Sequence, residues 1–146
     1  MRASSRPFWL AGLVGAAVAA VVNLVVFALG RAADVPFVVT GNGSTTQIGA
    51  GPVAFVSVLS LLVGTVFAVL LARRGSRARR LAQAIGAAVA LVSIAGPATQ
   101  ADEASTAVLL AAMHVIAGVV YVAAVEVAAR QSDRGTAPAA DAALQS

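Results

Sequence analysis

His114 is the only histidine of the chain, and it lies near the middle of a long apolar run. A histidine can bind ligands and exchange protons near neutral pH, and a polar side chain at membrane depth usually faces a bundle interior or a wet cavity. Ala111, Gly118 and Tyr121 share its helical face, so we expect the imidazole to point into a helix bundle, about 12 Å from the nearer membrane surface. The other apolar runs place polar residues at a similar depth: Asn23, Ser57, Ser60 and Ser93.

Two interpretations of this polar cluster (Asn23, Ser57, Ser60, Ser93 and His114) stay open. In the first, the cluster lines a small outward-facing pocket in which His114 binds a ligand, relays a proton or senses pH. In the second, it is a network of interhelical hydrogen bonds, each contributing about 0.6 kcal/mol to the bundle. The second interpretation is favoured, because one serine and one backbone carbonyl would be enough to satisfy a histidine.

Most catalytic and cofactor chemistry lacks the residues it needs. The chain has no cysteine, and all 10 of its basic residues are arginine, which excludes thiol catalysis, thiolate metal sites and Schiff-base chemistry. One histidine without a nearby intramembrane carboxylate offers too few ligands for a metal. Ser93 and His114 lack a third, orienting acid, and the chain has no G-x-S-x-G motif. We therefore expect no enzyme, no metal and no cofactor.

Composition and hydropathy identify the elements that must position this cluster. Of 146 residues, 60% are hydrophobic and 11% are charged, and the mean hydropathy is +0.91; soluble domains carry about 25% charged residues. Four apolar runs approach the roughly 20 residues that cross a bilayer. The fold expected is all-α, a four-helix transmembrane bundle with spans of about 8–29, 52–72, 81–95 and 106–129, the third weakened by Gly96-Pro97. Residues 1–129 form this domain, and the polar tail 130–146 is expected to be disordered.

Arginine placement predicts the orientation. All arginines but Arg31 lie before the first run, after the fourth, or in the short link between the second and third, where Arg73, Arg74, Arg77, Arg79 and Arg80 cluster. Short cytoplasmic segments carry such an excess, so both termini should lie inside a bacterial plasma membrane. This distribution also argues against nucleic acid as a partner, although the net charge is +4. The link could instead bind anionic lipid head groups, and the first run could be a cleaved signal peptide, but it is longer than usual for one.

Two local patterns add detail to the bundle. The first external loop has β-prone runs on both sides of Asn42-Gly43, which is a hairpin signal. Each helix also has a stripe of small residues that can pack closely against a neighbour. Near the inner end of the fourth span, Glu126 and Arg130 are spaced for an ion pair within the helix.

The order of features resembles a known family over residues 8–128. The first span ends VVNLVVFALG, the second closes in a double arginine, the third ends LVSIAGP and the fourth opens LLAAMHVIAGVV. This resembles the small four-span actinobacterial membrane proteins grouped as domain of unknown function 6069. Asn23, Ser93 to Pro97 and Met113-His114 carry most of the similarity. The family implies a multi-pass membrane protein and no particular activity.

Three functions remain in order of preference. The first is a non-enzymatic interaction or accessory protein that contacts membrane lipids, a second copy of itself or a membrane-protein partner through its small-residue stripes. The second is a small-ligand or pH-sensing protein that uses the polar cluster around His114. The third is a subunit of a transporter or membrane enzyme.

Overall fold

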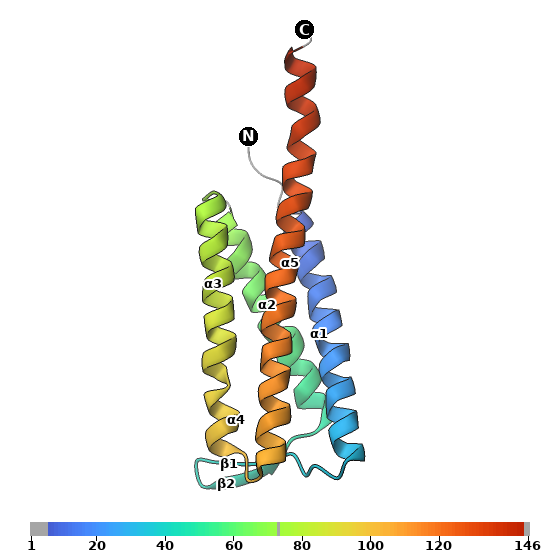
Figure 1. The fold of residues 1–146 in the computed structure, drawn as a ribbon, viewed down its shortest axis with the longest axis vertical. Helices are drawn as coiled ribbons and strands as arrows, with labels where there is room; N and C mark the ends of the chain where they lie inside the picture. The colour runs from blue at the N-terminus through green and yellow to red at the C-terminus, as the bar shows by residue number, and fades with distance from the viewer. Residues whose placement is uncertain (1–5, 73, 145–146) are drawn as a thin grey trace.

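The computed structural model describes residues 6–72 and 74–144, with side chains for 8–72 and 74–132. The chain is a bundle of long helices with one small hairpin, in the order α1 (Arg6–Ala32), β1 (Val38–Gly41), β2 (Ser44–Gln47), α2 (Ala50–Ala72), α3 (Ser76–Ser93), α4 (Ala95–Gln100) and α5 (Ala104–Leu144) (Figure 1). The expected all-α, four-helix architecture is confirmed. The disorder expected for the tail 130–146 stays a prediction, although α5 is described as continuing to Leu144.

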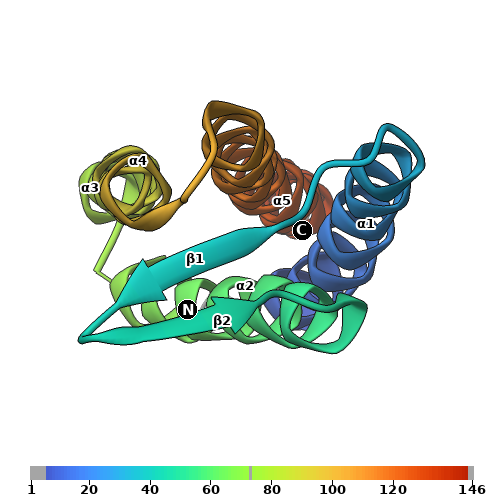
Figure 2. The ribbon, with the colours of Figure 1, turned by 90° about the horizontal axis from the view of Figure 1, so that it is seen from below.

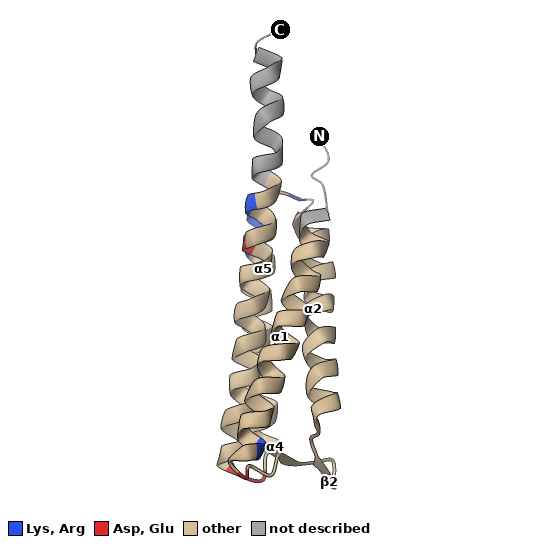
Figure 3. Cartoon of the chain, turned by 90° about the vertical axis from the view of Figure 1, so that its right-hand side faces the viewer, with Lys and Arg blue, Asp and Glu red and all other residues tan. Residues whose placement is uncertain are grey.

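Four segments are long and apolar enough to cross a membrane: Phe8–Ala32, Ala50–Ala72, Ser76–Gln100 and Ala104–Ser132. The outward-facing sides of these helices expose many large hydrophobic side chains, among them Leu13, Val21 and Leu29 of α1. The described charged residues gather toward the two ends of the bundle (Figure 3). An apolar belt between charged ends is what a multi-pass membrane protein presents to lipid.

The third span is longer than the sequence predicts. The expected stop at Gly96-Pro97 is only a break, because α3 ends at Ser93 and α4 continues the same span to Gln100. Pro97 lies in the first turn of α4, where a helix does not need the missing N–H group. This span is nevertheless the least apolar of the four, with a mean hydropathy of 1.7.

Helix α2 leans across the bundle. It packs on α1 over much of its length, with Thr65 against Gly12 in the half away from the hairpin, and it approaches α3 at the end opposite the hairpin (Figures 1 and 2). Helix α1 packs on α2 and α5, and α3 packs on α5. The lean of α2 therefore separates it from α3 and α4 toward the hairpin.

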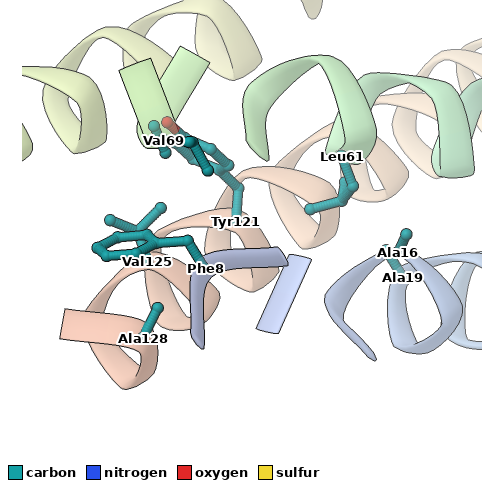
Figure 4. Packing of buried hydrophobic residues seen from close by; sticks show 9 residues of the cluster. Phe8, Ala16, Ala19, Leu61, Val69, Tyr121, Val125 and Ala128 are labelled. Atoms are coloured by element: carbon teal, nitrogen blue, oxygen red, sulfur yellow. The ribbon is translucent and has the colours of Figure 1, made fainter. Parts of the chain in front are cut away.

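Small residues allow these close contacts. A β-carbon on Gly12 of α1 would overlap Thr65 of α2, and one on Gly118 of α5 would lie 2.7 Å from Ala90 Cβ of α3. The small-residue stripes thus pack helices of the same chain against one another. Larger side chains fill the rest of the core, where Phe8, Val125 and Tyr121 meet between α1, α2 and α5 (Figure 4).

The predicted hairpin is present between α1 and α2. Strands β1 and β2 pair antiparallel with Gly41 opposite Ser44, which leaves Asn42 and Gly43 as the two turn residues. Both have positive φ angles, 52° and 76°, as a type I′ turn requires. The hairpin lies across the end of the bundle (Figure 2), held by a bridge between Val39 and Ala101 and by the Asp102 N–H, which donates to the Val38 carbonyl.

Candidate functional site

A cavity of about 890 Å³ lies between α2 on one side and α3 and α4 on the other, and α5 forms its floor. We call it the lateral cavity. All members of the predicted polar cluster line it: Asn23, Ser57, Ser60, Ser93 and His114. The structure therefore brings together residues that are spread over 91 positions of the sequence, from four different helices.

Asn23 and Ser57 are joined by one hydrogen bond, and each also donates to a backbone carbonyl. The Asn23 amide nitrogen donates to Ser57 Oγ at 2.9 Å and to the Met113 carbonyl at 3.4 Å, and so joins α1 to α2 and α5. The Ser57 hydroxyl in turn donates to the Val53 carbonyl at 2.7 Å. Asn23 is 3% exposed, and its Oδ1 atom has no hydrogen-bond partner among the described residues. This pair matches the structural interpretation.

Ser60 and Ser93 face the cavity from opposite walls. The Ser60 hydroxyl donates to the Val56 carbonyl at 2.8 Å, and that of Ser93 donates to the Ala90 carbonyl at 2.7 Å. Both bonds lie within the residue's own helix. They use the hydroxyl hydrogens and leave lone pairs of both oxygens available as acceptors.

His114 is half-buried on α5, and its tautomer follows from one contact. Nδ1 lies 2.7 Å from the Leu110 carbonyl oxygen, which can only accept. Nδ1 must therefore carry the hydrogen, and in the neutral ring Nε2 is then an acceptor. No hydrogen bond joins Nε2 to another residue in the described part of the chain.

The ends of the cavity are made by residues that the sequence analysis did not assign to the site. Val39 and Ile48 of the hairpin segment and Gln100 of α4 line one end, and Tyr121 lines the other. The Tyr121 hydroxyl donates to the Ala82 carbonyl of α3 at 3.1 Å, and the ring fills the space beside Gly64 and Gly86. Gly64 and Gly86, on two different spans, were the signal for this contact in the sequence, because positions without side chains leave room for a large side chain from a third helix.

The described lining of the cavity contains no acidic side chain. No orienting acid therefore accompanies Ser93 and His114 in the part of the lining that the structure describes. The described residues also contain no group of three or more His, Cys, Asp or Glu that could hold a metal ion.

The arginine cluster lies at the opposite end of the bundle from the hairpin. Arg74, Arg77 and Arg80 are exposed and Arg79 is half-buried, whereas Arg73 lies outside the described residues. Close by, Arg130 Nε donates to Glu126 Oε1 at 3.0 Å, which confirms the predicted ion pair. Gln83 of α3 also contacts that carboxylate, 3.5 Å from Oε2.

A comparison with known families settles the resemblance. The model described as a family of unknown function (DUF6069) matches residues 3–131. The chain belongs to this family. No curated protein and no solved structure matches this DUF6069 member significantly. The family's description assigns no activity, and the actinobacterial origin suggested by the resemblance stays a prediction.

Proposed function

We propose that this DUF6069 member is a non-catalytic protein of the bacterial plasma membrane that binds a small apolar molecule in the lateral cavity. The observation that carries the proposal is the cavity itself, whose volume of about 890 Å³ lies within the range of roughly 300–1,000 Å³ typical of small-molecule sites. Such sites combine a mostly apolar wall with a few convergent polar groups. Ser60, Ser93 and His114 supply those groups.

The distribution of charge supports an orientation with both termini in the cytoplasm. Of the described arginines, only Arg31 lies at the hairpin end, where Asp34, Asp102 and Glu103 are also exposed. Cytoplasmic segments are enriched in arginine. The hairpin would then lie outside, and the polar wall of the cavity would be nearer the outer surface.

Association with a protein partner, the first expectation from the sequence, has less support than ligand binding. It depended on small-residue stripes that could face a partner, yet Gly12, Gly64 and Gly86 contact side chains of the same chain. Membrane lipids remain the proposed partners, because the outward-facing sides of the membrane-spanning helices expose many large hydrophobic side chains.

Native mass spectrometry of the protein released from a mild detergent tests ligand binding. Val63 and Val66 form a matched pair on α2, 61% and 43% exposed, of which only Val63 lines the cavity. We expect a non-covalent mass excess in the parent and in Val66→Trp that is lost in Val63→Trp. A bare chain or bare oligomer in all three would contradict the proposal.

A further inference from the structure

We propose that the ligand of the lateral cavity is an uncharged lipid with a hydroxyl group, which enters sideways between α2 and α3. Its hydroxyl would donate to His114 Nε2, and its apolar body would run toward Tyr121. This inference rests on the proposed function, since it names the class of molecule that the same cavity takes.

The mouth of the cavity lies on the lipid-facing side of the bundle. Val63 of α2 and Val89 of α3 both line the cavity, yet they are 61% and 62% exposed. Side chains that line a hollow and are also exposed mark its opening, and both lie well inside membrane-spanning segments. The hairpin covers the end toward the aqueous side (Figure 2). A molecule dissolved in the bilayer can therefore enter without crossing water.

The head group must be uncharged. No Asp, Glu, Lys or Arg is among the cavity-lining residues of the described chain. An ionised phosphate or ammonium group held there would be desolvated without a counter-ion, which is very costly. This requirement excludes a phospholipid head group from the cavity.

The head group must also donate a hydrogen bond. Within the spans, the polar atoms available to a ligand are acceptors: Nε2 of His114 and the oxygens of Ser60 and Ser93, whose hydrogens are already bonded to backbone carbonyls. The Tyr121 hydroxyl is likewise bound to the Ala82 carbonyl. Gln100, at the hairpin end, is the exception with an amide donor. A hydroxyl group supplies such a donor in an uncharged lipid, whereas an ether or ester has no hydrogen to give.

The apolar half of the cavity gives the ligand its direction. From His114 to Tyr121 the α5 floor is apolar and, at 1.5 Å per residue, about 10 Å long. Ala117 and Gly118 form this floor, Val63 and Phe67 form one wall, and Tyr121 closes the end. A transmembrane helix needs a groove of about 30 Å, whereas this hollow is closed at one end by Tyr121 and at the other by the hairpin. These dimensions favour a slender lipid over a helix of a second copy.

Matched probes separate the hydroxyl from the rest of the ligand. Farnesol, farnesyl methyl ether and farnesyl phosphate share one apolar chain and differ in their head groups. We would titrate each into the detergent-solubilised full chain and measure bound fractions by native mass spectrometry. Farnesol should bind about tenfold more tightly than the ether, as expected for one buried hydrogen bond. The preference should disappear in His114→Ala and persist in His114→Gln, whose amide oxygen is also an acceptor.

The outcomes distinguish this inference from the proposed function. Equal binding of farnesol and the ether, with both lost in Val63→Trp, would overturn the requirement for a hydroxyl group and leave the cavity as an apolar binding site. If farnesyl phosphate binds most tightly of the three probes, the requirement for an uncharged head group is overturned. A dimer that Val63→Trp dissociates, with no probe bound, would show that a second copy covers the mouth. Binding of no probe by a monomer would count against both proposals. Each variant is compared only if its helical circular dichroism and melting temperature match those of the parent.

Discussion

The ring of Tyr121 on α5 occupies the space where a β-carbon of Gly86 on α3 would lie. The same ring lies 2.8 Å from the β-carbon position of Gly64 on α2. One side chain thus joins three spans and closes the end of the lateral cavity opposite the hairpin. The absence of side chains at the two glycines is what allows α2 and α3 to converge on it.

Gly86→Ala should destabilise the bundle. A methyl group there overlaps the Tyr121 ring, and overpacking of this kind costs about 1–3 kcal/mol, more than the gain of up to about 1 kcal/mol in helix propensity. Gly51→Ala on α2 is the control, since its β-carbon would have no neighbour within 4 Å. Unfolding titrations in mixed micelles measure both variants. Equal stability of the two would show that Tyr121 does not fill this space.

Asn23 and Ser57 should be energetically coupled. Their 2.9 Å hydrogen bond joins α1 to α2, and interhelical bonds in membranes average about 0.6 kcal/mol, with a maximum near 1.7. A double-mutant cycle of Asn23→Ala and Ser57→Ala should give a coupling in this range. The same cycle with Asn23 and Ser60 should give none, because the Ser60 hydroxyl bonds only within its own helix. Coupling of equal size in both cycles would contradict the assigned bonds.

Shortening Tyr121 should change the length of ligand that the cavity accepts. Tyr121 also borders a small void beside Phe8, Gly12 and Thr65, so Tyr121→Ala opens the cavity toward it. We expect geranylgeraniol to gain affinity relative to farnesol in Tyr121→Ala, while Tyr121→Phe, which keeps the ring, retains the parent preference. Native mass spectrometry with both alcohols measures the ratio. An unchanged affinity ratio in Tyr121→Ala would contradict the assignment of Tyr121 to the cavity wall.

Gly43→Val should unfold the hairpin without unfolding the bundle. Gly43 has a φ of 76°, and a left-handed conformation costs an L-residue about 1–2 kcal/mol, with β-branched residues disfavoured further. Backbone amides of residues 38–47 should then exchange faster in hydrogen-exchange mass spectrometry. Asn42→Gly, which tolerates the neighbouring φ of 52°, should leave their exchange unchanged. Fast exchange in the parent itself would contradict a stable hairpin.

The orientation can be tested with single cysteines, because the chain has none of its own. Ser44→Cys, in β2, should react with a membrane-impermeant maleimide on intact spheroplasts. Ser76→Cys, at the start of α3, should react only after lysis. The reverse pattern would invert the proposed topology.

Local chemistry explains why much of the architecture was predictable. The apolar runs had to become spans because hydropathy and length decide insertion, and Asn42-Gly43 specifies the hairpin turn through its backbone preferences. The third span was underestimated because Gly96-Pro97 reads as a stop, although proline is tolerated in the first turn of α4. Sequence analysis did not assign Tyr121 to the cavity wall. Its ring lies between Gly64 and Gly86, and that placement depends on the relative positions of three helices, which the sequence does not give.

The sequence by itself determined the number of spans, though not the full length of the third, and it specified the hairpin through its Asn42-Gly43 turn. It also determined the positions of the polar residues along their helices, because a helix has a fixed rise per residue: Asn23, Ser57, Ser60, Ser93 and His114. Only the tertiary structure decided which of these groups satisfy each other and which line the cavity. Asn23 and Ser57 pair across a helix contact, whereas His114 faces the hollow created by the lean of α2. Rotation and tilt of each helix depend on packing against its neighbours, and a sequence rich in small residues permits many such packings.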